Sequence, residues 1–240
     1  MNFIFRLLAI FVLVMLGQPA RAADEMFDFE ILRFRAKMLA ARPYVPRPNN
    51  VPQSLRTLTY DQYRLITFDE EQTRWRRENV PFQLQYSHPG FVHEHSVQLN
   101  EVNGRTSTPI KYAPSLFKFG GLKVGASLPE TVGFAGFRVL GALDRPWDEL
   151  VSFLGASYFR SLCMRTVYGL SARGLALDPA GPNGEEFPVF EEFWIERPAV
   201  EAKKFVVYAL LNSPSVAGAY RFVVTPGAET VMQTPGFWVR

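Results

Sequence analysis

Short runs of alternating apolar and polar residues, separated by proline and glycine, fill most of this 240-residue chain and constrain its fold most strongly. Residues 82–86 and 96–102 alternate as half-buried strands do, and Asn103-Gly104 predicts a tight turn after the second run. Further strands are predicted at 134–140, 151–153, 167–170, 193–195, 205–211, 219–224 and 236–240. Many short strands with turns between them favour a mainly β fold, a large antiparallel β-sandwich.

One short helix is predicted near the start of the chain. Asp28 is placed to cap it, and apolar residues recur at helical spacing from there to Pro43. These residues are Ile31, Leu32, Phe34, Met38 and Leu39. We expect this N-terminal helix to pack on the main core. A proline-rich connector follows at 43–52, and a second short helix or turn is predicted from Thr59.

The first 22 residues are predicted to be a signal peptide. Residues 1–6 are positively charged, residues 7–17 are apolar, and Ala20-Arg21-Ala22 gives a small-x-small cleavage pattern. The alternative is a membrane anchor, but this apolar run is short for a hydrocarbon core of ~30 Å, which needs about 20 residues. The sequence therefore predicts an exported protein, cleaved after Ala22, with no stable membrane span.

The charge and cysteine content narrow the classes of function. Cleavage would remove Arg6 and Arg21 from a chain with 26 basic and 23 acidic residues, which leaves the remainder close to neutral. A nearly neutral chain lacks the strongly positive electrostatic potential that attracts nucleic acid. Cys163 is the only cysteine, so an internal disulfide is excluded.

Residues 155–198 combine aromatic rings, arginines and carboxylates on predicted strands, a mixture that is costly to bury unless the charges are paired. It also suits a sugar-binding cleft, where rings stack on pyranose faces and polar groups bond hydroxyls. The candidate carbohydrate-binding residues are Tyr158, Arg160, Tyr168, Arg173, Glu186, Glu192, Trp194 and Glu196. If 191–197 is a strand, Glu192, Trp194 and Glu196 share one face. In the competing interpretation, the arginines pair with these glutamates and the rings belong to the core.

The sequence assigns no catalytic residue, no metal and no cofactor. Glycoside cleavage needs two carboxylates ~5–9.5 Å apart, whereas Glu192 and Glu196 would be roughly 13 Å apart along a strand. His93 and His95 would share one face of a strand, but no third metal ligand is evident nearby. The Gly155-Ala156-Ser157 run is not the G-x-S-x-G motif of serine hydrolases.

Several longer motifs suggest a family. They are GASYFR (155–160), YGLSARGLA (168–176), GEEFPVFEEFWIERP (184–198), AARPY (40–44), YDQYR (60–64), GFAGFR (133–138), YALLNSP (208–214) and GAYRF (218–222). In this order they resemble the N-terminal part of the periplasmic glucan biosynthesis protein G/D family of Gram-negative bacteria. The resemblance covers nearly all of residues 23–240.

The resemblance implies a periplasmic protein of osmoregulated periplasmic glucan biosynthesis, which binds β-1,2-linked glucan in a cleft. It implies a β-sandwich of the galactose-mutarotase-like type, here incomplete at residues 23–240, with the family's C-terminal immunoglobulin-like domain absent. The alternatives are a β-1,2-glucan hydrolase or transglycosylase, or a truncated, non-functional fragment of one. The family's catalytic aspartates would lie beyond the end of this chain, so enzymatic activity stays open. The partners implied are the β-glucan and a separate chain that supplies the missing C-terminal half.

Overall fold

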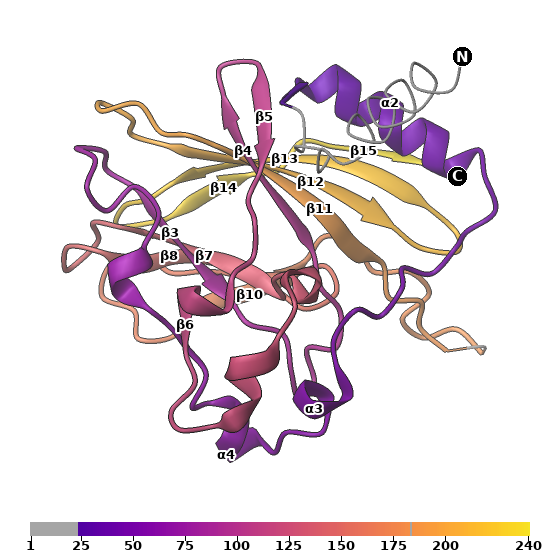
Figure 1. Ribbon diagram of the computed structural model, residues 1–240. Coiled ribbons are helices and arrows are strands. Elements are labelled where there is room, and N and C mark those ends of the chain that lie inside the picture. Colours follow the sequence, from indigo (N-terminus) through magenta and orange to yellow (C-terminus); the bar gives the residue numbers. More distant parts are fainter. Residues whose placement is uncertain (1–23, 183) are drawn as a thin grey trace, which may run out of the picture.

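The computed structural model describes residues 24–182 and 184–240, and the predicted signal peptide at 1–22 lies outside the described residues. Two β-sheets face each other, and helix α2 (Phe29–Ala40) lies across the far face of the larger sheet (Figure 1). The predicted mainly β, antiparallel sandwich is confirmed. Two aromatic-rich interfaces hold these three layers together.

The larger sheet has the strand order β1-β5-β4-β11-β12-β13-β14, with β15 paired to β13. Its strands are β1 (Glu25–Met26), β4 (Gln98–Asn103), β5 (Thr106–Pro109), β11 (Val189–Glu196), β12 (Phe205–Asn212), β13 (Ala217–Thr225), β14 (Val231–Gln233) and β15 (Gly236–Val239). All neighbours are antiparallel except β4 and β11, which run parallel. Parallel neighbours need a long crossover connection, and most of the smaller sheet lies in that connection.

The smaller sheet has the strand order β10-β9-β8-β7-β3. Its strands are β3 (Gln83–Ser87), β7 (Gly136–Gly141), β8 (Asp148–Leu154), β9 (Tyr158–Ser161) and β10 (Leu170–Arg173). A two-stranded ribbon, β2 (Thr67–Phe68) and β6 (Phe117–Lys118), lies beside it together with the one-turn helices α3 (Gln53–Arg56) and α4 (Tyr60–Tyr63). Single 3-10 turns occur at Glu70–Gln72, Pro114–Leu116, Lys123–Ser127 and Glu130–Val132.

Phenylalanine rings fill the space between the two sheets. Phe137 and Phe153 of the smaller sheet meet Phe193 of β11 at ring-centroid distances of 5.1 and 5.3 Å, and Phe153 meets Phe222 of β13 at 5.0 Å. All four rings are buried. Rings this size contribute most of the burial energy of a core, and edge-to-face pairs add to it. The apolar positions of the predicted strands therefore form the inner layer.

Helix α2 packs on the opposite face of the larger sheet. Leu32 and Ala36 are buried against that face, in an apolar cluster that is separate from the core between the two sheets. The prediction that this helix packs on the main core was therefore wrong, because the larger sheet has a second apolar face that the helix covers. Phe34 and Met38 belong to the same predicted apolar set but point outward and are exposed. The helical spacing predicted the position of the helix correctly, but it assigned too many residues to the buried face.

Some strand boundaries differ from the sequence-based expectation. The strand predicted at 167–170 lies at Leu170–Arg173, and His93 and His95 lie outside any strand, apart from an isolated bridge between Gly90 and His93. The short helix predicted from Thr59 is α4, which Thr59 caps together with Gln62 in a capping box.

Replacing Asp28 by alanine is expected to lower the free energy of unfolding by about 1 kcal/mol. The Asp28 side chain accepts a hydrogen bond from the Ile31 N–H at 2.9 Å and so satisfies one free donor of the first turn of α2. Chemical denaturation of the Asp28→Ala and Asp28→Ser variants measures this effect. Serine also caps helices, so a serine variant as unstable as the alanine variant would contradict the capping role.

Candidate functional site

A row of polar residues crosses all five strands of the smaller sheet. Gln85 of β3 lies opposite Arg138 of β7, Arg138 opposite Ser152 of β8, Ser152 opposite Arg160 of β9, and Arg160 opposite Ser171 of β10. Residues directly opposite each other share a face of the sheet. Their chain neighbours Phe137, Phe153 and Phe159 point to the core, so this row lies on the outer side. We call this surface the polar face.

Hydrogen bonds and ion pairs run along the polar face. Arg138 donates to Gln85 Oε1 at 3.0 and 2.6 Å, and Gln85 Nε2 donates to the Thr73 hydroxyl at 3.0 Å. Glu149 bridges the two arginines, at 3.6 Å from Arg138 and 3.1 Å from Arg160. Because each charge has a partner, these groups are held in fixed positions on the sheet.

Exposed aromatic rings border the polar face. Trp147, just before β8, is 45% exposed, and it lines a cavity of about 310 Å³ together with Gln85, Arg138 and Glu149. Tyr168, just before β10, is 80% exposed, and the Arg160 guanidinium lies 5.5 Å from its ring centroid. Rings with one free face beside rigid hydrogen-bonding groups can hold a ligand that has both apolar and hydroxylated surfaces.

The structure brings four of the sequence-predicted site residues together on the β9–β10 hairpin. Arg160 and Tyr168 form the pair just described, and Tyr158 lies opposite Arg173. The Arg173 guanidinium is 5.8 Å from the Tyr158 ring centroid and forms an ion pair with Glu185. These four residues form one end of the polar face.

Glu186 lies apart from this group, in the loop before β11. It accepts hydrogen bonds from the Ser215 N–H at 3.0 Å and the Ser215 hydroxyl at 2.6 Å. Burial raises the pKa of Glu186, but the hydrogen bonds from Ser213 and Ser215 outweigh burial and leave that pKa lowered. The contacts of Glu186 therefore tie two loops together.

Glu192, Trp194 and Glu196 share one face of β11, as their spacing predicted, but α2 lies over that face. Trp194 is 2% exposed and stacks on Phe27 at 4.9 Å. Glu192 pairs with Arg35 of α2 at 2.7 Å, and burial raises the pKa of Glu192. Glu196 accepts a hydrogen bond from the Tyr208 hydroxyl at 2.6 Å. These three residues are on the opposite side of the sandwich from the polar face, and a sugar-binding role for them stays a prediction.

The arginines of the predicted site do form ion pairs, but with other carboxylates than expected. Arg160 pairs with Glu149, Arg173 with Glu185, and Arg197 with Glu78. These partners come together through the tertiary fold, and for Arg173 and Arg197 the carboxylates lie in loops, which spacing along the chain does not reveal.

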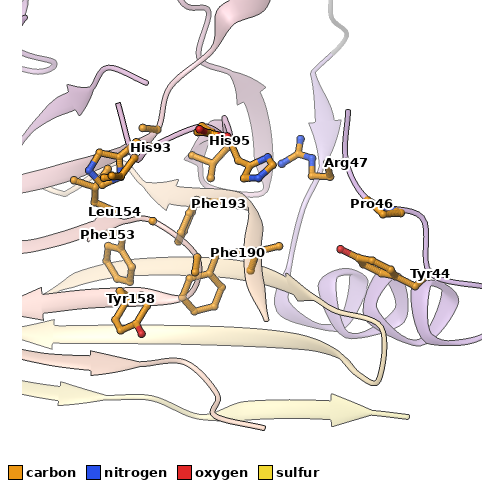
Figure 2. A pocket seen from close by; sticks show the side chains of 17 residues that line it. Tyr44, Pro46, Arg47, His93, His95, Phe153, Leu154, Tyr158, Phe190 and Phe193 are labelled. Atoms are coloured by element: carbon orange, nitrogen blue, oxygen red, sulfur yellow. The ribbon is translucent and has the colours of Figure 1, made fainter. Parts of the chain in front are cut away.

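A second cavity, of about 390 Å³, opens at one end of the sandwich (Figure 2). Its lining is mainly apolar and includes Phe153, Phe190 and Phe193, which belong to the core, and Tyr158. Figure 2 shows the imidazoles of His93 and His95 and the guanidinium of Arg47 on the other side of it, and Tyr44 and Pro46 also line it. We call this cavity the apolar pocket.

The histidines of the apolar pocket have few polar partners. Burial lowers the pKa of His93, whose ring packs on Tyr63 at 5.7 Å. In the described ranges 24–182 and 184–240, no group of three or more His, Cys, Asp or Glu side chains is placed to hold a metal ion. None of the helices in this part of the chain is long and apolar enough to cross a membrane.

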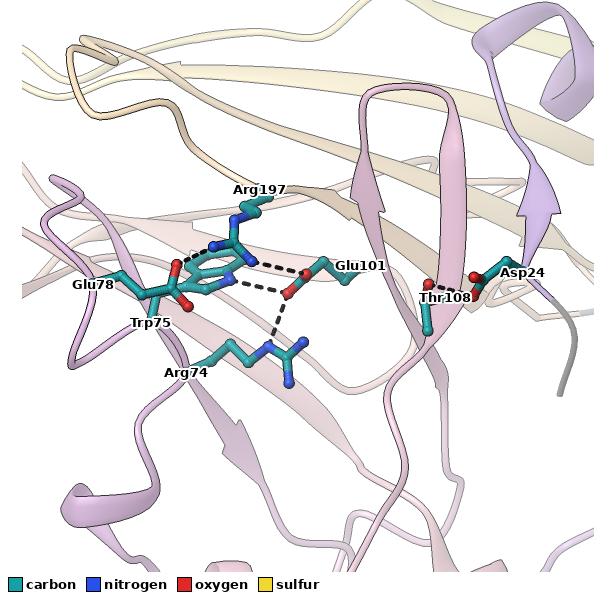
Figure 3. A network of polar contacts seen from close by, with 7 residues as sticks. All are labelled: Asp24, Arg74, Trp75, Glu78, Glu101, Thr108 and Arg197. Atoms are coloured by element: carbon teal, nitrogen blue, oxygen red, sulfur yellow. Dashed lines mark hydrogen bonds and ion pairs between the residues drawn. The ribbon is translucent and has the colours of Figure 1, made fainter. Parts of the chain in front are cut away.

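A separate polar network surrounds Glu101 of β4 (Figure 3). The Glu101 carboxylate accepts hydrogen bonds from Arg74 Nε at 2.8 Å and Trp75 Nε1 at 2.9 Å, and Arg197 lies 3.8 Å away. Figure 3 also shows Arg197 paired with Glu78. This network connects the 70–78 segment to β4 and to the end of β11. Its polar groups form their hydrogen bonds and ion pairs with one another. Its role is therefore structural.

Sequence reasoning missed half of the polar face. Arg138 is the only charged residue of β7, Gln85 is one of the polar residues of β3, Glu149 and Ser152 lie in β8, and Trp147 lies in the turn before β8. Arg138 ends the GFAGFR motif, which supported the resemblance but was given no role. For Arg138, a lone charged residue in an otherwise apolar strand is the signal that could have identified the position.

The comparisons with known proteins agree with the sequence motifs. The family model described as "Periplasmic glucan biosynthesis protein, MdoG" matches residues 27–235. A glucans biosynthesis protein G of Ralstonia nicotianae is 47% identical over 218 residues, which are 90% of this chain and 43% of that protein. The protein of the same name from Bradyrhizobium diazoefficiens is 44% identical over 220 residues, covering 88% of this chain and 43% of that protein.

A glucans biosynthesis protein G of Pseudomonas aeruginosa is 45% identical over 208 residues, covering 86% of this chain and 40% of that protein. The chain thus spans about two fifths of the length of these relatives, and it matches their N-terminal part. The family resemblance read from the motifs is confirmed, and the chain belongs to the periplasmic glucan biosynthesis protein family, MdoG.

Proposed function

We propose that this chain acts in periplasmic glucan biosynthesis by binding β-glucan on the polar face. The family and the relatives' names support the biosynthetic context, and the predicted signal peptide supports a periplasmic location. The observation that carries the proposed site is the cross-strand row from Gln85 to Ser171, bordered by the exposed rings of Trp147 and Tyr168.

The chemistry of the polar face fits a chain of glucose units. A pyranose has an apolar face that stacks on an aromatic ring, while its equatorial hydroxyls need fixed donors and acceptors. Arg138, Glu149 and Arg160 are held by their mutual pairing, so a sugar meets groups that are already ordered and loses less entropy on binding.

The apolar pocket is a weaker candidate for the same ligand. Phe153, Phe190 and Phe193 in its lining are 1–3% exposed, and they offer a hydroxylated ligand no hydrogen bonds. Burying sugar hydroxyls there without partners would cost free energy. The polar side chains in the lining of this pocket are few, and they include Tyr44, Arg47, Tyr158 and the histidines His93 and His95.

A β-1,2-glucan hydrolase or transglycosylase is the second candidate function, favoured by the presence of Glu149 at the centre of the polar face. Glycoside cleavage needs a pair of carboxylates facing each other across the bond. Glu149 contacts Arg138 and Arg160, and Asp148 accepts hydrogen bonds from the N–H and Nε of Arg145 at 2.8 and 3.1 Å. These acids are engaged as ion-pair partners. Incubation with linear β-1,2-glucan is expected to release no new reducing ends.

Replacing Trp147 or Tyr168 by alanine is expected to weaken binding of linear β-1,2-glucooligosaccharides by about tenfold each, because each substitution removes one stacking ring. Calorimetric titration measures the effect. Phe34→Ala is the matched control, since Phe34 is a ring on the outer surface of α2 whose exposure of 62% lies between those of Trp147 and Tyr168. The proposal would be contradicted if the unsubstituted chain did not bind the oligosaccharides. It would also be contradicted if both ring substitutions left the binding unchanged.

A further inference from the structure

The outer surface of α2 carries an apolar stripe that is open to solvent. Phe34, Met38 and Ala41 recur at the i, i+4 and i+7 spacing that places residues on one face of a helix. Phe34 is 62% exposed, Met38 is 40% exposed, and Ala41 is exposed as well. Leu32 and Ala36 face the larger sheet instead. The helix therefore has a second apolar face, which is directed away from the sandwich.

Basic side chains flank the stripe on both sides. Arg33 and Lys37 lie on one flank, where their charged groups are 4.7 and 5.5 Å from the centroid of the Phe237 ring of β15. Arg35 and Arg42 lie on the other flank, where both line a groove of about 280 Å³ beside β11 and β12. The stripe also borders this groove, so apolar and cationic groups form one continuous surface.

The charge of this segment is positive. Residues 31–60 contain six lysines and arginines and no aspartate or glutamate. Arg33 and Arg35 form ion pairs with glutamates. Within the ranges 24–182 and 184–240, neither Lys37 nor Arg42 forms an ion pair with a carboxylate. Lys37 and Arg42 are therefore the charges left for an external anion.

The carboxylates near this surface are engaged elsewhere. Glu192 pairs with Arg35 at 2.7 Å, and Glu191 accepts a hydrogen bond from Asn212 Nδ2 at 3.0 Å. The acidic residues of the 24–30 segment are gathered at the N-terminal end of α2, before the stripe begins. The C-terminal part of the helix is thus the part that suits a negatively charged partner.

We propose that α2 docks the chain on a phospholipid surface that carries anionic headgroups. An apolar stripe between flanks of Lys and Arg is the pattern of helices that lie in the plane of a bilayer interface. The apolar side chains enter the acyl boundary, and the cations meet the negative potential of the headgroups. Val45, 73% exposed in the connector just after α2, extends the apolar contact.

Lipid fits this surface better than a folded protein partner does. A stable protein interface buries roughly 800 Å² on each partner with close shape complementarity, whereas this stripe has two large side chains and a shallow border of long, flexible cations. Lipid tails and headgroups adapt to such a surface without a preformed pocket. The predicted signal peptide also supports a membrane partner, because an exported chain crosses a bilayer and works beside it.

Docking through α2 sets the orientation of the sandwich. The helix covers the outer side of the larger sheet, and the polar face is the outer side of the smaller sheet (Figure 1). The polar face therefore points away from the bilayer and stays open to a large ligand. The docking itself does not depend on what the polar face binds.

Cosedimentation with lipid vesicles tests the proposal. The protein used is residues 23–240, which include every described residue, because the apolar 7–17 segment would bind lipid by itself. We expect binding to vesicles of equal parts phosphatidylglycerol and phosphatidylcholine, and about tenfold weaker binding to phosphatidylcholine alone. Added salt is expected to weaken the binding to the anionic vesicles.

Substitutions on the stripe and its flanks locate the docking surface. Phe34→Glu is expected to weaken binding to the anionic vesicles by about tenfold or more, because it places a carboxylate in the stripe. Val200→Glu makes the same change of net charge at a valine that is 55% exposed in the β11–β12 loop, and this matched control should bind like the unsubstituted chain. Replacing Lys37 and Arg42 together by glutamine is expected to remove most of the preference for anionic vesicles. All these variants should keep the melting temperature of the unsubstituted chain, since the side chains are exposed.

Several results would overturn the proposal. They are binding to neither kind of vesicle, equal binding to both kinds, and equal weakening by Phe34→Glu and Val200→Glu. Size exclusion provides a further contrary result, a dimer of the chain that Phe34→Glu dissociates, which would show that a second copy covers the stripe. No sugar is present in these measurements, so their failure leaves the proposed glucan site untouched.

Discussion

Replacing Glu101 by alanine is expected to lower the free energy of unfolding by about 3 kcal/mol, because it removes the shared acceptor of a buried network. The Glu101 side chain is 10% exposed and accepts from the Trp75 indole, which is itself buried. Without Glu101, the indole N–H loses its acceptor, and Arg74 and Arg197 lose a common counter-charge. Urea denaturation of the substituted chain measures the loss.

Two further variants separate the buried network from an ordinary surface ion pair. Glu71→Ala removes the partner of Arg76 in an exposed pair, and it should cost less than about 1 kcal/mol. Glu101→Gln keeps one acceptor oxygen for Trp75 and should be less damaging than Glu101→Ala. If Glu71→Ala and Glu101→Ala destabilise the chain equally, the Glu101 network does not fasten the 70–78 segment.

Acidification is expected to destabilise the fold between pH 6.5 and pH 4 through His88. Burial lowers the pKa of His88 to about 4 from the ordinary 6.5. Its Nδ1 lies 2.7 Å from the Pro89 carbonyl, which can only accept, so Nδ1 carries the proton and Nε2 accepts from the Tyr112 hydroxyl at 2.8 Å. The aromatic rings of Phe117 and Phe119 enclose this neutral imidazole.

The unfolded chain binds a proton at His88 below pH 6.5, whereas the folded chain does so only below about pH 4. The stabilisation is therefore fully present above pH 6.5 and is lost as the pH falls toward 4, with a total on the order of 3 kcal/mol. Burial lowers the pKa of His93 as well, so His93 adds to the same slope.

Denaturation curves across this pH range measure the effect. His88→Asn keeps a donor for the Pro89 carbonyl but does not titrate, and it is expected to flatten the pH dependence. A pH profile identical in the unsubstituted chain and in His88→Asn would show that His88 is not the group responsible.

The features that depend on local sequence were predicted well. The Asp28 cap, the helix it begins, the Asn103-Gly104 turn and most strands follow from residue spacing over a few positions. The family motifs are likewise local runs of residues. These signals need no knowledge of which segments become neighbours.

The arrangement of the candidate site depends on long-range pairing and could not be predicted. Trp194 and Glu192 become buried because α2, more than 150 residues earlier in the chain, lies over them. The polar face exists because residues between 85 and 171 fall into register on five strands. A periodic pattern shows that a strand has two faces, but it does not show which face another layer will cover.

Nuclear magnetic resonance titration with β-1,2-glucooligosaccharide tests the glucan site most directly, because the chain has four tryptophans and hence four indole N–H resonances. Trp147 borders the polar face, Trp75 and Trp194 are buried elsewhere, and Trp238 lies on β15. We expect only the Trp147 indole resonance to shift, together with backbone resonances around Tyr168 and Arg160. A saturating titration that leaves Trp147 unshifted, or that shifts only resonances of the apolar pocket around Tyr44 and His93, would contradict binding on the polar face.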